Sequence, residues 1–363
     1  MGAMRRLGVL AACLLTSLSG GAACAEPGGH VVRERVGPPA LNVSGRAPAP
    51  RREAPAAALA PLWTFHAGAP LRAGAGVGQG GIAVGSVDGY VHALRADGAY
   101  RWSFTVKGAV VATPLVDARG AVYVATSSRK LHALTPAGTL GWSVTLAGVA
   151  IDALRWSKDG EMLIATREGI AYAITTSGVV KAAAALKEPL TTPPLPLPSG
   201  RWLVGGERGH VFSFDGWRVS QERPVTSPVL ALAPRAEGYA GLSAAGLFWP
   251  GQSPEQRARQ LGCGPERVLV AGEDGAIGWL DGDAVGWVGT VGEPLSAAPA
   301  CSRDGRALLP LASGALVVLA GAEQRRYSLG SAALFTPTID EARGQVVVSS
   351  ADGRSRSLPL GAL

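Results

Sequence analysis

The sequence predicts an all-β fold, an eight-bladed β-propeller whose blades are four-stranded antiparallel sheets. The first observation is a repeat, because Val84–Leu94 (VGSVDGYVHAL) returns about 40 residues later as Val124–Leu134 (VATSSRKLHAL). The second is that short apolar alternations in each copy are separated by tight turns, which is typical of strand hairpins. The third is that almost no segment has the periodicity of a helix. A repeat of this length and pattern indicates a propeller blade.

The composition suits such a fold and narrows the class of partner. The 363 residues include 50 Gly and 26 Pro, as many short strands and turns require. The formal net charge of +7 is spread over scattered arginines, with no basic block. Scattered charge of this kind is typical of a solvated surface, so we expect no nucleic-acid partner.

Residues 1–25 are predicted to be an export signal. Arg5 and Arg6 precede an apolar run over residues 7–18, and small residues follow up to Ala25. The run is too short for a convincing membrane span. Cys24 lies at the right depth to be the lipidated cysteine of a bacterial lipoprotein, but Gly21 stands where such signals usually have Leu. Lipidation of Cys24 and plain cleavage after Ala25 both remain open.

A linker is predicted over residues 26–61, ahead of a propeller over residues 62–363. The linker is rich in Pro, Ala and Arg and has no apolar periodicity. A flexible chain of this length reaches about 30 Å, which would let an anchored protein work a short way off a membrane.

The number of blades follows from the turn of each middle hairpin. A turn residue recurs at eight positions, which are Gly89, Lys130, Gly169, Gly209, Gly246, Gly275, Gly314 and Gly353. Glycine supplies the positive φ that a tight hairpin needs. The spacing shortens between Gly246 and Gly275, where we expect the missing inner strand at residues 259–266. Seven blades therefore remain an alternative to eight.

The ends of the repeat array predict how the ring closes. Residues 62–65 (LWTF) match the outer-strand sequence around Trp102 and Trp142 but have no blade in front of them. The last blade, residues 333–363, has only three strands before the chain ends. We expect the first strand to complete the last blade, which removes an exposed sheet edge.

The repeat resembles the pyrroloquinoline quinone (PQQ)-like propeller repeat over residues 62–363. The shared features are an inner-strand Thr-Pro, as at Pro114, a Val-rich strand, a Gly turn, an Ala-Leu strand, then Asp-Gly and Trp. That family includes quinoprotein dehydrogenases, the outer-membrane assembly lipoprotein BamB, and sensor or scaffold domains without a cofactor. The plan of export signal, linker and one ring looks most like BamB. The family's tryptophan-docking motif implies that four residues pack one blade on the next, namely Trp63, Trp102, Trp142 and Trp287.

The residues that quinoprotein chemistry would need are missing. The resemblance implies that those enzymes hold PQQ beside a calcium ion with acidic and amide ligands, and that many carry adjacent cysteines. The single asparagine, Asn42, lies in the linker, and there is no Cys-Cys pair. A calcium site of carboxylates and carbonyls alone stays open. His92 and His132 share a register in which later blades have Tyr172 and Phe212, which favours packing over metal ligation. We predict no catalytic residue, no cofactor and no metal.

Cys263 and Cys301 fall at similar heights in the inner strands of neighbouring blades. In an oxidising compartment they would form a disulfide, which stabilises a loop of this size by about 4 kcal/mol. Two buried free thiols are the alternative.

The predicted function is that of a non-catalytic scaffold, BamB-like, in the periplasm or at the periplasmic face of the outer membrane. It would assist outer-membrane protein assembly by contacts with other envelope proteins, among them β-barrel assembly components, and would reach the membrane only through a lipid anchor. An envelope sensor or ligand-binding module is the alternative, and a PQQ-dependent dehydrogenase comes third. The longest departure from the repeat, residues 249–264, is either an interaction loop or a degraded blade strand. Its candidate contact residues are Trp249, Pro250, Glu255, Arg257 and Arg259.

Overall fold

The computed structural model describes residues 57–363, apart from residues 59, 236–237, 251–257, 263–266, 283, 322 and 351. The regular secondary structure of its described residues is almost wholly β-strand, and their one helix is a short 3₁₀ turn, η1 (Leu360–Ala362). No described helix is long and apolar enough to cross a membrane. The predicted all-β class is confirmed.

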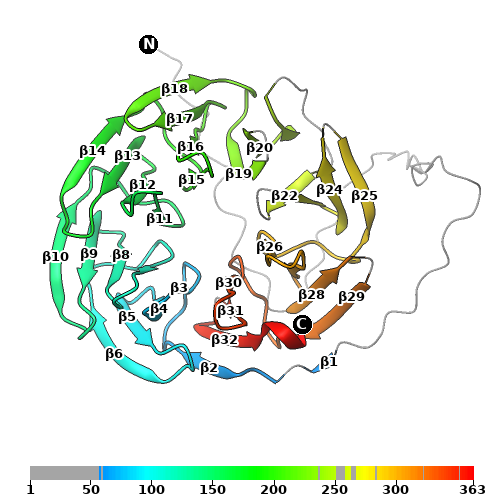
Figure 1. The fold of residues 1–363 in the computed structure, drawn as a ribbon, viewed down its shortest axis with the longest axis horizontal. Coiled ribbons are helices and arrows are strands. Elements are labelled where there is room, and N and C mark those ends of the chain that lie inside the picture. Colours follow the sequence, from blue (N-terminus) through cyan, green and yellow to red (C-terminus); the bar gives the residue numbers. More distant parts are fainter. Residues whose placement is uncertain are drawn as a thin grey trace, which may run out of the picture. The chain divides into compact units, whose positions relative to one another are not determined.

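Eight sheets follow one another around a ring (Figure 1). Blade one contains β3 (Gly76–Gly78), β4 (Gly81–Gly85), β5 (Tyr90–Leu94) and β6 (Tyr100–Thr105). Blade two contains β7 (Leu115–Val116), β8 (Val122–Ala125), β9 (Lys130–Leu134) and β10 (Leu140–Thr145). Blade three contains β11 (Arg155–Trp156), β12 (Met162–Ala165), β13 (Ile170–Ile174) and β14 (Val180–Ala185). Blade four contains β15 (Leu195–Pro196), β16 (Trp202–Gly205), β17 (Val211–Asp215) and β18 (Arg218–Glu222).

The second half of the ring holds the irregular blades. Blade five has three described strands, β19 (Val229–Arg235), β20 (Gly238–Ser243) and β21 (Gly246–Phe248). Blade six contains β22 (Ala258–Gly262), β23 (Val268–Gly272), β24 (Ala276–Asp281) and β25 (Ala284–Thr290). Blade seven contains β26 (Ala300–Cys301), β27 (Ala307–Pro310), β28 (Ala315–Ala320) and β29 (Glu323–Ser328). Because β22 is an inner strand in the region where the sequence lost its marker, the count of eight is confirmed and seven is excluded.

The ring closes as predicted. Blade eight contains β30 (Thr338–Asp340), β31 (Gln345–Ser349) and β32 (Arg354–Pro359), and its fourth strand is β2 (Trp63–His66). The strand β2 runs antiparallel to β32, with Trp63 opposite Ser357 and His66 opposite Arg354. The first and last parts of the propeller therefore share one sheet, and separating them would break a blade.

One further strand was not expected. The two residues of β1 (Ala57–Ala58) lie inside the predicted linker and pair in parallel with Tyr327 and Ser328 of β29. This pairing makes blade seven a five-stranded sheet. The chain thus contacts the ring before β2, and the outer edge of a blade is seen to accept an added strand.

The hairpin turns follow the predicted glycine pattern with one correction. Gly89, Gly169 and Gly209 have φ values of 86°, 90° and 86°. In blade two the left-handed residue is Arg129, with φ 59°, and not Lys130. Lys130 instead opens β9 and pairs with Thr145. The prediction was one residue late because no glycine marks this turn.

The core lies between adjacent blades. One cluster joins Leu131 of blade two to Leu154 and Ile164 of blade three, and another joins Leu269 of blade six to Leu309 of blade seven. Each blade therefore buries its faces against its two neighbours, as ring closure requires. The loops at the two ends of the ring are left for contacts with other molecules.

Because the strands of each blade alternate in direction, the loops divide between two faces. The hairpin face carries the middle hairpin turns, such as the one at Gly89, and the connections between blades, such as residues 106–114. The turn face carries the turns after inner strands, such as residues 117–121, and the outer turns, such as residues 95–99.

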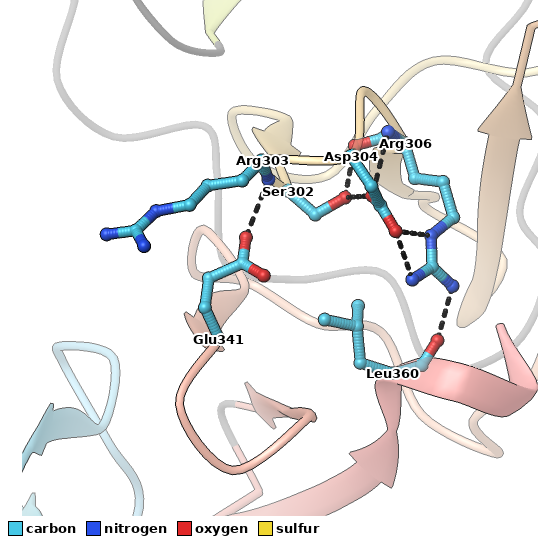
Figure 2. Close-up of polar contacts among 6 residues, drawn as sticks. All are labelled: Ser302, Arg303, Asp304, Arg306, Glu341 and Leu360. Atoms are coloured by element: carbon cyan, nitrogen blue, oxygen red, sulfur yellow. Dashed lines mark hydrogen bonds and ion pairs between the residues drawn. The ribbon is translucent and has the colours of Figure 1, made fainter.

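A polar network on the turn face fastens blade seven to blade eight (Figure 2). Arg306 Nε donates to Asp304 Oδ2 at 2.9 Å, and the same guanidinium donates to the Leu360 carbonyl. Arg303 N donates to Glu341 Oε1 at 2.7 Å. Hydrogen bonds from Arg306 and then Ser302 lower the pKa of Asp304 to about 2.

Candidate functional site

The principal candidate site is a hollow of about 530 Å³ at the centre of the hairpin face. The inner strands of the blades surround the middle of the ring (Figure 1). The lining comes from the points where those strands begin, in blades one, two, three, six, seven and eight. Its polar side chains are Thr113, Asp152, Arg155, Gln260, Thr336 and Thr338. We call it the central hollow.

Arg155 is the cation of the central hollow. The Arg155 side chain is accessible to water although protein atoms surround it, as expected for a group inside a solvent-accessible cavity of the ring. Burial lowers the pKa of Arg155, and the nearby Asp152 carboxylate opposes that shift. Its closest recorded acceptor is the Leu154 carbonyl, 3.4 Å from Nη1, which is a weak hydrogen bond. The charge of this guanidinium is therefore poorly satisfied by the described residues.

Asp152 holds a conformation that few side chains adopt. Its φ of 43° is in the left-handed region, which costs a residue other than glycine about 1–3 kcal/mol. The main chain here links two blades, because Thr113 N donates to the Asp152 carbonyl at 2.6 Å. The strain thus sits where blade three meets blade two at the edge of the central hollow.

The described residues contain no group of three or more His, Cys, Asp or Glu that could hold a metal ion. His92 lies 5.2 Å from the ring of Phe65, and His132 is buried. Burial lowers the pKa of both histidines. Their surroundings agree with the packing role expected from their register.

Three tryptophans link successive blades on the turn face. Each donates its indole N–H to a carbonyl in the outer turn of the next blade, with Trp63 bonding Ala96 at 3.2 Å, Trp102 bonding Pro136 at 2.9 Å and Trp142 bonding Thr176 at 2.9 Å. Each ring also covers a glycine of that turn. At Gly98, Gly138 and Gly178 a Cβ would lie 2.2, 2.6 and 2.8 Å from the ring. Trp287 of β25 is half-buried against the core between blades five and six.

Residues 57–187, which contain these three tryptophans, match the family model described as outer membrane protein assembly factor BamB. The crystal structure of BamB from Moraxella catarrhalis superposes with a TM-score of 0.65 and 16% identity, covering 83% of this chain and 99% of that chain. The chain is a β-propeller with the fold of BamB, and its residues 57–187 carry PQQ-like repeats similar to those of that family. A comparison with curated proteins gave no match.

A rigid propeller ring is suited to holding protein partners. The architecture suits that role, because short strands hold a rigid ring and leave loops from many blades on each face. The same repeat also occurs in dehydrogenases, as noted above.

The expected interaction loop is only partly described. Trp249 is 5% exposed and fills the core between blades five and six, with the Arg235 guanidinium 5.4 Å from the centre of its ring. The expectation that Trp249 contacts a partner is therefore wrong, because its large ring packs where blade five meets blade six. Arg259 lies in β22 and its Nε is 3.4 Å from Glu273 Oε2. Pro250 is exposed.

Three other predicted positions, Cys24, Glu255 and Arg257, lie outside the described residues. Interaction by this segment therefore stays a prediction that rests on residues 250–257.

Cys301 is disulfide-bonded and lines the central hollow from β26. Its partner lies outside the described residues, so the pairing with Cys263 stays a prediction. The neighbouring backbone supports it. A Cβ at Gly262 would lie 2.3 Å from the Pro299 carbonyl, so the end of β22 runs against the segment that leads into Cys301.

Proposed function

We propose that the protein is an exported, non-catalytic scaffold that assists the assembly of outer-membrane proteins by binding other envelope proteins. The observation that supports this most is the match of residues 57–187 to the BamB family model. The structural likeness adds that the ring accounts for 99% of the BamB chain from Moraxella catarrhalis. The role for which that family is named, assembly of outer-membrane proteins, is the role we propose.

The blades offer a way to hold a partner. The outer strand of each blade has one edge that no neighbouring strand of its own blade covers, and such edges bind extended segments by main-chain hydrogen bonds. Blade seven already uses this mode with part of its own chain, since β1 pairs with β29. An assembly partner or a barrel precursor presents extended segments of the same kind.

The N-terminal region supplies the location in this proposal. Residues 1–25 direct export, and residues 26–61 connect the ring to that end of the chain. With Cys24 lipidated, the ring would work within about 30 Å of the membrane surface. With cleavage after Ala25, it would be free in the periplasm.

The central hollow favours a second candidate, an envelope module that binds a small anionic ligand. Arg155 is surrounded by protein, points into a cavity of about 530 Å³ and has only a weak recorded acceptor. A cation in such a setting gains from an anionic ligand.

The two candidates separate in a depletion experiment in the protein's own host. We expect depletion to lower the folded fraction of outer-membrane barrels, and wild-type protein to restore it. Arg155→Gln should restore it equally well if the ring is a scaffold, whereas failure of Arg155→Gln with normal folding would favour the ligand-binding module. An unchanged folded fraction after depletion would contradict the assembly role.

A further inference from the structure

The turn face contains a second hollow that the proposed function does not use. It has a volume of about 340 Å³ and is lined by residues 79–81, Ala96 and four arginines, Arg95, Arg101, Arg119 and Arg343. The four arginines come from blades one, two and eight. None of its described lining residues is acidic. We call it the arginine hollow.

Two of the four guanidinium groups are held in place by carbonyl oxygens. Arg101 Nη1 donates to Gly80 O at 3.0 Å, and its Nη2 donates to Pro136 O at 3.1 Å. Arg343 Nη1 donates to Gly78 O at 3.2 Å and lies 2.8 Å from Asp340 Oδ2. These contacts tie blade one to both of its neighbours, so the ring itself orients this pair.

Glycine makes room for Arg101. Gly120 has φ 88°, and a Cβ there would lie 3.0 Å from Arg101 Nη1. The missing side chain of this turn thus leaves room for the Arg101 guanidinium to lie close to its main chain.

The other two arginines, Arg95 and Arg119, make no such contacts between blades among the described residues. Arg95 and Arg119 are exposed, and in the described part of the chain their hydrogen bonds come from main-chain groups alone. Arg95 N donates to Ala99 O at 2.8 Å, Arg95 O accepts from Gly98 N at 3.0 Å, and Arg119 N donates to Asp117 Oδ1 at 2.9 Å. A role in fastening blades accounts for Arg101 and Arg343. It does not account for two more guanidinium groups at the same hollow.

The neighbouring carboxylates are engaged elsewhere. Asp117 accepts from Ala121 N at 2.8 Å and from the Tyr123 hydroxyl at 3.2 Å, besides its bond from the Arg119 main chain. Asp97 accepts from Ala99 N at 3.0 Å, within its own turn. Asp340 is paired with Arg343. Asp117 and Asp97 are thus engaged within their own loops, whereas Asp340 offsets the charge of Arg343. Three further arginines line the hollow, which leaves a local positive potential.

We propose that the arginine hollow binds a phosphate group, carried by a small phosphate or by a phospholipid headgroup. Arginine forks match the oxygens of phosphate in pairs, and several of them converge here. The only apolar side chain among the described lining residues is that of Ala96, so the hollow offers no apolar pocket to anchor a peptide beyond its charged groups. The site lies on the face opposite the central hollow and is independent of the assembly role.

Calorimetric titration of the full-length protein with inorganic phosphate, at constant ionic strength, tests the site. The test variant is Arg95→Ser/Arg119→Ser, which removes the pair without side-chain bonds and should melt like wild type. The matched control is Arg201→Ser/Arg303→Ser, because both residues are exposed arginines in inner turns of the same face and the net charge is equal. We expect the test variant to weaken phosphate binding at least tenfold and the control to stay within twofold.

A vesicle arm separates the two sources of phosphate. Sedimentation with phosphatidylglycerol vesicles, against phosphatidylcholine vesicles, should show binding that the control variant keeps and the test variant loses if the headgroup is the ligand. Binding of inorganic phosphate without vesicle binding would assign a small phosphate. Equal losses in the test and control variants would overturn the proposal, as would a wild-type protein that binds neither probe. If the serine variant is unstable, Arg95→Lys/Arg119→Lys keeps the charge, and we expect weaker binding because the paired hydrogen bonds are lost.

Discussion

The contact between Trp102 and Gly138 allows a sharp test of how the blades are held together. Replacing Gly138 by Ala introduces two penalties. The residue has φ 81°, and its new Cβ would lie 2.6 Å from Cγ of Trp102. Gly160 provides the matched control, since its φ is 76° and a Cβ there would meet nothing within 4 Å.

The two variants should differ by the cost of displacing the indole. A left-handed conformation costs an alanine about 1–2 kcal/mol, and both variants incur it. Overpacking adds about 1–3 kcal/mol, and only Gly138→Ala incurs it because the Trp102 ring is held by its hydrogen bond to Pro136. In urea unfolding, the two variants should have equal m-values, and the free energy of unfolding of Gly138→Ala should be about 1–3 kcal/mol lower than that of Gly160→Ala. Equal stability of the two variants would refute the docking role of the tryptophan.

Three further predictions concern ring closure, acid stability and the disulfide. Deleting residues 62–66 removes β2 from blade eight, so the truncated protein should aggregate in light scattering and melt earlier, and an unchanged melt would contradict closure by β2. The pKa of Asp304 falls from 3.8 to about 2, so the stability from its Arg306 contact is present above pH 4 and is lost as the pH falls from about 4 to about 2. Asp304→Asn should lower the free energy of unfolding at pH 7 by at most about 1 kcal/mol, because the Asp304 side chain is 53% exposed. The variant should also lose less stability than wild type between pH 4 and pH 2. An equal loss in both proteins would count against this contact. The unreduced, denatured exported protein should show no free thiol if Cys263 pairs with Cys301, and two free thiols would eliminate the bridge, which otherwise contributes about 4 kcal/mol.

Much of the fold could be predicted because the same sequence pattern recurs in the blades of a propeller. The glycine turns indicated the number of blades. Residues 62–65 indicated how the ring closes, because an outer strand with no blade in front of it must pair with a strand of another blade. The turn at Arg129 was misplaced by one residue because an arginine takes the left-handed conformation there. The strand β1 left no signal, because two alanines paired through their main chain produce no side-chain pattern.

The candidate sites were harder to predict. Arg343 lies beside residues 79–81 only because the ring brings blade eight against blade one. Arginines scattered along the sequence therefore looked like a solvated surface. Arg155 was likewise missed, because nothing in its sequence neighbourhood shows that an inner strand begins at the central hollow. Trp249 was taken for a contact residue because the irregular segment hid its place in the core.

Affinity purification of the tagged full-length protein from gently solubilised envelopes, followed by mass spectrometry, tests the scaffold role most directly. We expect a β-barrel assembly protein to be recovered with the wild-type ring and with Arg155→Gln alike, and to be lost when residues 62–66 are deleted. Recovery of the protein alone, from envelopes in which the assembly proteins are abundant, would contradict the account.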